Sequence, residues 1–350
     1  MTADLPRDRR PAATGPPAAG PPAAAAGTGG TPGLRGAIES GRFAVTAELD
    51  LPHGIDPDRV DAKASALSGW VDAVNVTDNP GASVMPAAMA GSVLAQRAGL
   101  EPVMQLVCRD RNRIGLQSDL LGAALLGIPN VLLLTGDHPR FGDHPGAKPV
   151  FDLDSVTLVG AARALRDSGR LLGGRTVTPA PSWLIGAVEN PFAAPQRFRA
   201  ARLAKKVAAG AEFVQTQFVF DVPMFARFMA DARDLGLTDR CTVLAGIGPV
   251  RSPRALEFMR FEVPGIHIPD DVVRRLTSVP SDRFAAEGVR LCAEIAAQVR
   301  EIPGVGGVHV MVFGKEGLVP EILEAAGIGP RVVGGRVGRR ASERGTRNVG

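Results

Sequence analysis

Short apolar runs alternate with amphipathic stretches along most of this chain, and the alternation predicts its secondary structure. The apolar runs predict eight strands, near residues 43–49, 72–77, 102–108, 130–135, 182–188, 212–218, 242–247 and 307–313. The stretches between them, such as DRVDAKASALSG and SVTLVGAARALRDSG, carry apolar residues at helical spacing, and most end in glycine, as helices commonly do. Strands that alternate with helices are typical of a parallel sheet.

Eight such units favour closure of the sheet into a (β/α)8 TIM barrel of the α/β class. An open doubly wound sheet is disfavoured because no G-x-G-x-x-G sequence follows the first predicted strand. A chain of 350 residues is compatible with one barrel domain. The connection 248–306 is the longest, and we expect it to hold two helices and the GIHIP segment.

The two ends of the chain differ in composition from its centre. Residues 1–34 are rich in Pro, Ala and Gly, and residues 331–350 are rich in Gly and Arg. Segments with so few large apolar side chains cannot bury enough surface to offset the entropy of ordering. We therefore predict a disordered tail at 1–34, a single barrel domain at 35–330, and a disordered basic tail at 331–350.

Charge and cysteine usage exclude several classes of protein. The formal net charge is +4, but residues 331–350 hold six Arg and one Glu, which exceeds that total. The remainder is slightly acidic, so no basic stripe for nucleic acid is expected. The three cysteines and five histidines lack metal-ligand spacing, and no run is long and apolar enough for a membrane span or a signal peptide. These features predict a soluble, cytoplasmic protein without a metal site.

Polar residues stand at the ends of five predicted strands: Glu48, Thr77, Arg109, Asp137 and Gln217. In a parallel α/β barrel the carboxyl ends of all strands meet at one face, where active sites are built. The placement of acid, hydroxyl, guanidinium and amide groups at successive strand ends therefore predicts an enzyme.

Each strand-end residue also has a structural interpretation. Asp137 precedes His138 and Pro139 and could equally be a helix N-cap or a turn residue. Gln217 lies in an apolar strand, where it could bind a ligand or join a satisfied core network. Glu48 has apolar neighbours that should raise the pKa of its carboxyl group, so that it can hold a proton near neutral pH and act as a general acid.

Several motifs occur in a distinctive order: AEL at Glu48, NVTDN at Thr77, QLVCRDRN, LLLTGDHP at Asp137, KKVAAGAEFVQTQFVFD and GIGPV. Over about residues 40–325 the chain resembles the methylenetetrahydrofolate reductase family, whose members are flavin-containing (β/α)8 barrels. The KVxAGAxxxxTQFxFD segment is the most specific of these motifs. The resemblance is strongest to a branch that carries VTDN and VCRDRN, some members of which work beside partner subunits or methyltransferases.

The resemblance implies a reaction in one-carbon and methionine metabolism. Reduced flavin would deliver hydride to 5,10-methylenetetrahydrofolate and give 5-methyltetrahydrofolate. By motif position, Glu48 is implied to protonate N10 as the imidazolidine ring opens. Asp137 would stabilise the resulting cation and tune the flavin, and Gln217 would hydrogen-bond the pterin and the hydride donor.

The resemblance also implies FAD as the cofactor, with FMN as the less favoured choice, and a set of contacts for it at Thr77, Gln105, Gly136, Asp137 and Lys206. Thr77 would lie near the flavin, Gly136 would permit close backbone approach, and Lys206 would lie near the cofactor's phosphates. Lys206 has the alternative of being a solvated helix lysine.

Two departures from the family pattern leave the electron donor open. Gln105 stands where many relatives have His, and Met259 stands where some have a Phe that stacks on nicotinamide. NADH, NADPH and a reduced partner protein all remain candidates. The alternative function is a flavin- and folate-binding subunit that depends on a partner reductase or methyltransferase. A homo-oligomer is compatible with either function, and a barrel aldolase is disfavoured because no strand-end lysine suits a Schiff base.

Overall fold

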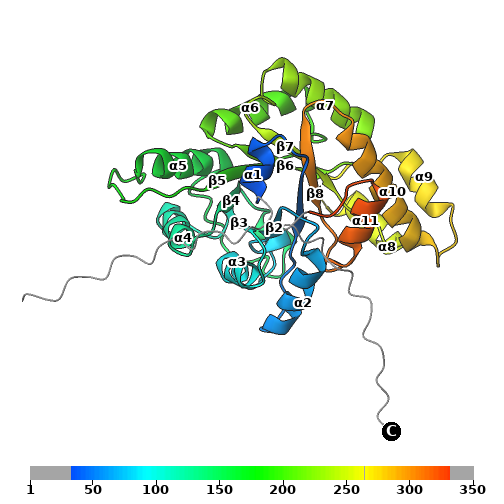
Figure 1. The fold of residues 1–350 in the computed structure, drawn as a ribbon, viewed down its shortest axis with the longest axis horizontal. Coiled ribbons are helices and arrows are strands. Elements are labelled where there is room, and N and C mark those ends of the chain that lie inside the picture. The colour runs from blue at the N-terminus through cyan, green and yellow to red at the C-terminus, as the bar shows by residue number, and fades with distance from the viewer. Residues whose placement is uncertain (1–32, 264, 332–350) are drawn as a thin grey trace, which may run out of the picture.

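The computed structural model describes residues 33–263 and 265–331, and within them eight parallel strands close into a barrel in sequence order (Figure 1). The strands are β1 (Ala44–Glu48), β2 (Ala73–Val76), β3 (Pro102–Val107), β4 (Asn130–Leu134), β5 (Leu184–Glu189), β6 (Phe213–Phe218), β7 (Thr242–Ile247) and β8 (Val305–Val310). The barrel closes where β1 pairs with β8, with Thr46 opposite His309. The predicted fold class is confirmed, and each predicted strand is present.

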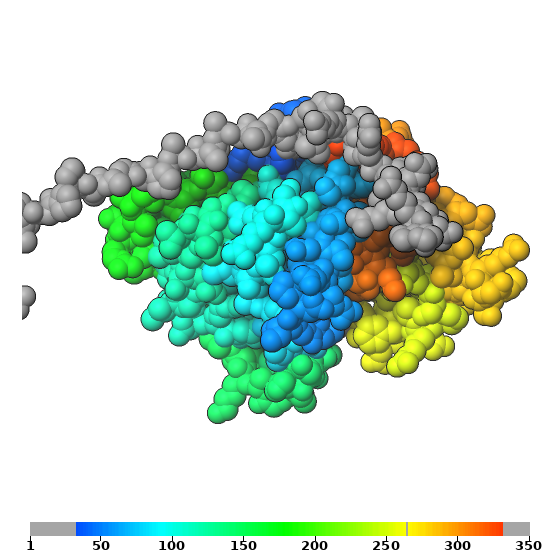
Figure 2. Space-filling model, turned by 60° about the horizontal axis from the view of Figure 1, so that its bottom comes forward, coloured from blue at the N-terminus to red at the C-terminus, as the bar shows by residue number. Residues whose placement is uncertain are grey.

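Helices surround the barrel, as a succession of βα units requires. They are α1 (Leu34–Glu39), α2 (Pro57–Leu67), α3 (Ala88–Arg97), α4 (Arg113–Leu125), α5 (Ser155–Ser168), α6 (Arg199–Ala209), α7 (Val222–Asp234), α8 (Pro253–Phe261), α9 (Asp270–Thr277), α10 (Phe284–Arg300) and α11 (Leu318–Ala325). Three 3₁₀ turns are η1 (Pro80–Ala82), η2 (Pro139–Phe141) and η3 (Gln196–Phe198). In space-filling view the segments from α2 to α4, coloured blue to teal, lie side by side on one face (Figure 2). No helix in the described ranges has the length and apolar character to cross a membrane.

The connection between β7 and β8 holds three helices, α8, α9 and α10, so the prediction of two was wrong. The additional helix is α9, which has only eight residues and buries only Val272 and Leu276. Three apolar residues, Val272, Val273 and Leu276, among acidic and basic neighbours are too few to show a helical period in the sequence. Strand β8 also begins two residues before the predicted range, at Val305.

Helix α1 closes the amino-terminal end of the barrel, and the sequence did not predict it. It begins at Leu34, the last residue of the predicted tail. Leu34 and Ala37 pack against the lowest layer of inward-facing side chains, which includes Leu132, Phe213 and Leu244. The remaining residues of the two predicted tails, apart from Gly33 and Arg331, lie outside the described residues. Arg331 itself is bound to the barrel, where its backbone N–H donates to Gly69 O at 2.6 Å.

The barrel interior changes from apolar to polar along the strand direction. The lowest layer is the apolar cluster that α1 covers. The layer above it contains four buried polar residues, Thr46, Asn75, Gln215 and His309, which are joined by hydrogen bonds. Outward-facing strand residues instead pack against the helices in one large apolar cluster. The interior is therefore built to present polar groups at the carboxyl ends of the strands.

Candidate active site

Glu48 ends β1 at the mouth of the barrel, and 15% of its side chain is exposed. Burial raises the pKa of its carboxyl group to about 8, with smaller contributions from the negative charges of Asp50 and Glu316. Glu48 therefore keeps its proton at neutral pH. The direction of this shift is the one expected from its apolar neighbours, although the two carboxylates were not foreseen.

Two further carboxylates and one lysine lie beside Glu48. Glu316 accepts a hydrogen bond from the Asp50 backbone N–H at 3.2 Å and forms an ion pair with Lys63 Nζ at 3.0 Å. Burial and the charge of Glu316 raise the pKa of Asp50 as well. Because three carboxyl groups share one ammonium group, the ionisation of Glu48 is opposed by its surroundings.

A buried histidine lies below Glu48, and the sequence reasoning missed it. His309 Nε2 is 4.0 Å from Glu48 Oε1, and His309 Nδ1 is 2.9 Å from Thr46 Oγ1. Burial lowers the pKa of His309 to about 3, so the imidazole is neutral. The available signal was the alternation of side chains along a strand. It places Thr46 and Glu48, the two residues beside His309, on one face of β1.

Hydrogen bonds inside the barrel hold this histidine in place. Gln215 Nε2 donates to Thr46 Oγ1 at 3.1 Å and to Asn75 Oδ1 at 2.9 Å. Thr46 Oγ1 also shares a hydrogen bond with His309 Nδ1 at 2.9 Å, so the imidazole is linked through Thr46 to the amides of Gln215 and Asn75. Because burial keeps the imidazole neutral, His309 does not take the proton of Glu48.

Three polar side chains that lie in or just beyond β2, β3 and β4 are available to a ligand. Thr77 and Gln105 are largely buried, while Asp137 is exposed. Across the described ranges, no protein group hydrogen-bonds any of these three side chains. The N-cap of η2 is His138, so Asp137 does not have the capping role that was its alternative.

The local backbone geometry requires glycine at position 136. Its φ is +88°, a conformation that side chains other than glycine rarely adopt. A Cβ there would lie 3.1 Å from Val107 Cβ and 3.2 Å from Arg109 Cβ. Glycine therefore lets the chain turn closely over the end of β3 on its way to Asp137.

The sequence left two roles open for Gln217, ligand binding or membership of a core network, and the structure gives these roles to two different residues. Gln215 belongs to the satisfied network inside the barrel. Gln217 Oε1 accepts a hydrogen bond from Phe218 N at 3.0 Å, which fixes the orientation of the amide. Its Nε2 has no protein partner in the part of the chain that the structure describes, so it can donate to a ligand.

Arg109 is a structural residue that ties three loops together. Its side chain is 3% exposed and forms an ion pair with Asp110. It also donates to Asn79 O at 3.1 Å and to Asp137 O at 3.3 Å. These bonds link the loops after β2, β3 and β4, and they hold the backbone that carries the Asp137 carboxylate. Arg109 is not oriented to bind substrate.

Lys206 is neither solvated nor free to bind a phosphate. Its side chain is 4% exposed, and its ammonium group donates to Glu189 Oε2 at 2.9 Å and to Val188 O. Burial lowers the pKa of this lysine. Met259 is similarly unavailable, because it is buried in α8, whereas its neighbour Phe258 is exposed.

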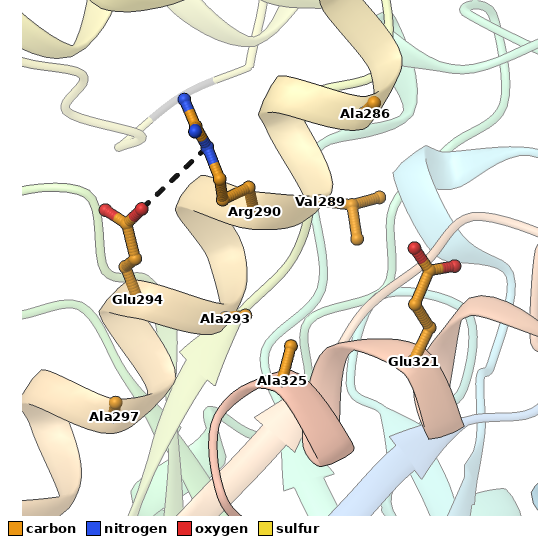
Figure 3. A pocket seen from close by; sticks show the side chains of 8 residues that line it. All are labelled: Ala286, Val289, Arg290, Ala293, Glu294, Ala297, Glu321 and Ala325. Carbon is orange, nitrogen blue, oxygen red and sulfur yellow. Dashed lines mark ion pairs between the residues drawn. The ribbon is translucent and has the colours of Figure 1, made fainter.

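A surface groove lies between α10 and α11 (Figure 3). It is lined mainly by small apolar side chains, with Glu321 on one side and the pair Arg290 and Glu294 on the other, 4.0 Å apart. It contains none of the polar strand-end residues. Among the described residues, no group of three or more His, Cys, Asp or Glu is arranged to hold a metal ion.

Comparison with known proteins identifies relatives of this chain. A family model described as methylenetetrahydrofolate reductase matches residues 34–327. The probable methylenetetrahydrofolate reductase (NADPH) of Caenorhabditis elegans is 24% identical over 281 residues, which cover 77% of this chain and 39% of that protein. Methylenetetrahydrofolate reductase (NADH) 1 of Zea mays is 26% identical over 222 residues, covering 57% and 34%. The chain thus spans less than half the length of these curated relatives.

A solved structure shares the fold. It is an uncharacterized protein from Clostridium thermocellum that binds two copies of 5-methyl-5,6,7,8-tetrahydrofolic acid. The two structures superpose with a TM-score of 0.60 at 13% identity, and the match covers 84% of this chain and 98% of that one.

Proposed function

Because the chain belongs to the methylenetetrahydrofolate reductase family, we propose that it reduces 5,10-methylenetetrahydrofolate to 5-methyltetrahydrofolate. The observation that carries the proposal is a carboxylic acid, Glu48, that keeps its proton at neutral pH in the mouth of a barrel. Ring opening of the substrate needs such an acid. Relatives named for NADH and for NADPH support a nicotinamide as the source of electrons.

In the proposed mechanism Glu48 protonates N10 as the imidazolidine ring opens to a 5-iminium cation. The carboxylate that remains lies beside Asp50 and Glu316, so the cation forms in a negative field that stabilises it. The unpaired carboxylate of Asp137 adds to this field from the end of β4. The free amide N–H groups of Gln217 would donate to acceptors on the pterin.

The residues present fit the ring of a flavin. Thr77, Gln105 and Asp137 offer unpaired polar groups from three neighbouring strands, as the polar edge of an isoalloxazine requires. We therefore propose that they and Gly136 contact FAD, with FMN as the alternative. When bound, reduced flavin supplies the hydride. Lys206 does not extend this set, and its ion pair with Glu189 instead positions the end of β5.

A second candidate is a folate-binding subunit that receives electrons from a partner protein. The observation that favours it is the burial of Met259, which leaves the position of the family's stacking phenylalanine without an accessible side chain. The presence of a protonated acid favours the complete reductase, because a binding subunit has no use for one.

The deciding experiment follows the visible spectrum of the purified protein during anaerobic addition of NADH, NADPH or dithionite, then of 5,10-methylenetetrahydrofolate. Bleaching by a nicotinamide and recovery with the folate would support the reductase. Bleaching by dithionite alone, with recovery, would support the partner-dependent subunit. A protein that cannot be loaded with flavin would contradict the proposed cofactor, and one that also fails to turn over the folate with NADH or NADPH would contradict the proposed activity.

Replacement of the acid gives a sharper test. Glu48→Gln should lower folate turnover by about 10²- to 10⁴-fold, the usual contribution of a general acid, while folate affinity changes little. Glu39→Gln is the matched control, since Glu39 lies on α1 at the opposite end of the barrel with 66% of its side chain exposed. Undiminished turnover in Glu48→Gln would remove Glu48 from the mechanism.

A further inference from the structure

An ion pair to which the proposed mechanism gives no role of its own lies beside the acid Glu48. Glu316, in the loop after β8, is only 3% exposed and pairs with Lys63 of α2 at 3.0 Å, while the Lys63 side chain is 20% exposed. Replacing a buried ion pair with apolar side chains is often neutral or stabilising. Stability alone therefore does not explain why two charges stand at this depth in the protein.

The pair is bonded to the backbone that carries Glu48. Asp50 follows Glu48 by two residues, and its backbone N–H donates to Glu316 Oε1 at 3.2 Å. The carbonyl oxygen of Asp50 accepts a hydrogen bond from Lys63 Nζ at 2.7 Å, and its carboxylate accepts one from the Gly314 backbone N–H. These bonds join α2, the end of β1 and the loop after β8. We call Asp50, Lys63 and Glu316 the charge cluster.

The loop that carries Glu316 has a strained backbone. Phe313 has a φ of 48°, and the other described residues besides glycine with positive φ also lie in loops at this end of the barrel: Asn79, Ala82 and Phe151. Strained loops of this kind persist only where the surroundings enforce them. Helix α2 packs beside α11, which follows the loop (Figure 1). The hydrogen bonds of the charge cluster therefore hold Glu316 against the end of β1.

Titratable groups face Glu48 from β8, from the end of β1 and from the loop after β8, with the lysine of α2 behind them. His309 of β8 is neutral and adds no net charge. The negative charges of Asp50 and Glu316 favour the protonated form of Glu48, whereas the ammonium group of Lys63 opposes them. The two members of the ion pair thus act in opposite directions on one proton.

We propose that Lys63 and Glu316 are positioning residues that set the pH range in which Glu48 can act as the general acid. The assignment rests on the proposed function. Without the charge of Glu316, the acid would ionise at lower pH, and without the charge of Lys63 it would hold its proton to higher pH. A general acid works best when its affinity for the proton matches the operating pH. The ion pair supplies this balance.

The pH dependence of kcat/KM for 5,10-methylenetetrahydrofolate tests the assignment, because its fall at high pH reports ionisation of the acid in the free enzyme. Glu316→Gln should move this fall to lower pH and Lys63→Met should move it to higher pH, each by roughly one pH unit. The double variant should lie between the two, and Lys63→Arg should retain the wild-type profile. Glu321→Gln is the matched control, because Glu321 lines the surface groove, which includes none of the charge cluster.

NMR titration of the Glu48 carboxyl carbon, in protein with carbon-13-labelled glutamate and without folate or flavin, measures the same effect independently of turnover. The spectrum of Glu48→Gln identifies the signal. Opposite displacements of the pKa of Glu48 in Glu316→Gln and Lys63→Met would support the assignment, because a loss of structure does not produce opposite signs. Displacements in one direction, or none, would overturn it. Opposite displacements in a protein that turns over no folate at any pH would instead overturn the proposed function and leave the control of the Glu48 proton in place.

Discussion

Glu48 combines one property that the sequence predicts with one that it does not. The apolar residues around it in β1 predict the direction of its pKa shift, because burial disfavours the carboxylate. The contribution of Glu316 to the raised pKa of Glu48 could not be predicted, because Glu316 lies 266 residues after Asp50 in the sequence. The pairing of His309 with Thr46 was hidden for the same reason, because it depends on the closure of β8 against β1.

The raised pKa of Glu48 has a consequence for stability as a function of pH. Between pH 4.5 and about 8 the folded protein keeps this proton, whereas the unfolded chain has released it. The free energy of unfolding should therefore fall as pH rises through this window. Glu48→Gln removes the effect, so the stability of this variant relative to wild type should increase with pH. Each unit of pKa shift corresponds to about 1.4 kcal/mol, so the total increase should reach a few kcal/mol. Urea unfolding at pH 5 and pH 8.5 measures the difference. A constant difference at the two pH values would contradict the raised pKa.

The strand ends were the most predictable elements of the site, because alternation and strand length place Glu48, Thr77 and Gln217 at the barrel mouth. The loops between them were less predictable. The sequence placed Arg109 at a strand end but gave no indication that its guanidinium would bind the backbone of two other loops. Lys206 shows the same limitation, since its partner Glu189 belongs to another element. Side-chain partners across loops depend on the closed barrel.

Arg109 should therefore matter for stability and for the order of the loops. Arg109→Ala removes a buried guanidinium that donates to the Asp110 carboxylate and to the part-buried carbonyl groups of Asn79 and Asp137, and should lower the free energy of unfolding by about 2–4 kcal/mol. Amide exchange should become faster in the loops after β2 and β4. Arg113→Ala is the control, because Arg113 forms an ion pair with Asp152 while 54% exposed, and solvent screens such surface pairs so that they contribute little to stability. Similar stability losses in the two variants would argue against the connecting role of Arg109.

At the scale of the whole molecule, the two ends of the barrel have separate functions. The carboxyl end carries the polar groups and the strained loops, whereas the amino end is closed by α1 over an apolar layer. Helix α1 escaped prediction because six residues show no helical period, and because no side chain of its own caps it. Its first N–H is instead bound by Glu101, at the start of β3, over a distance of 2.9 Å. Tertiary contacts, not local sequence, stabilise this helix.

This separation predicts that α1 can be weakened without loss of catalysis. Leu34 is fully buried in the lowest layer of the barrel, so Leu34→Ala should lower the free energy of unfolding by about 2–5 kcal/mol, as other buried leucines do. Turnover of 5,10-methylenetetrahydrofolate and its KM should stay within about twofold of wild type at temperatures where the variant is folded, because effects of distant sites are largely independent. Glu39→Ala, at an exposed position of the same helix, is the control for the stability measurement. A loss of turnover in folded Leu34→Ala would mean that helix α1 and the mouth of the barrel are coupled. The polar layer containing Thr46 and His309 would then transmit the disturbance to Glu48.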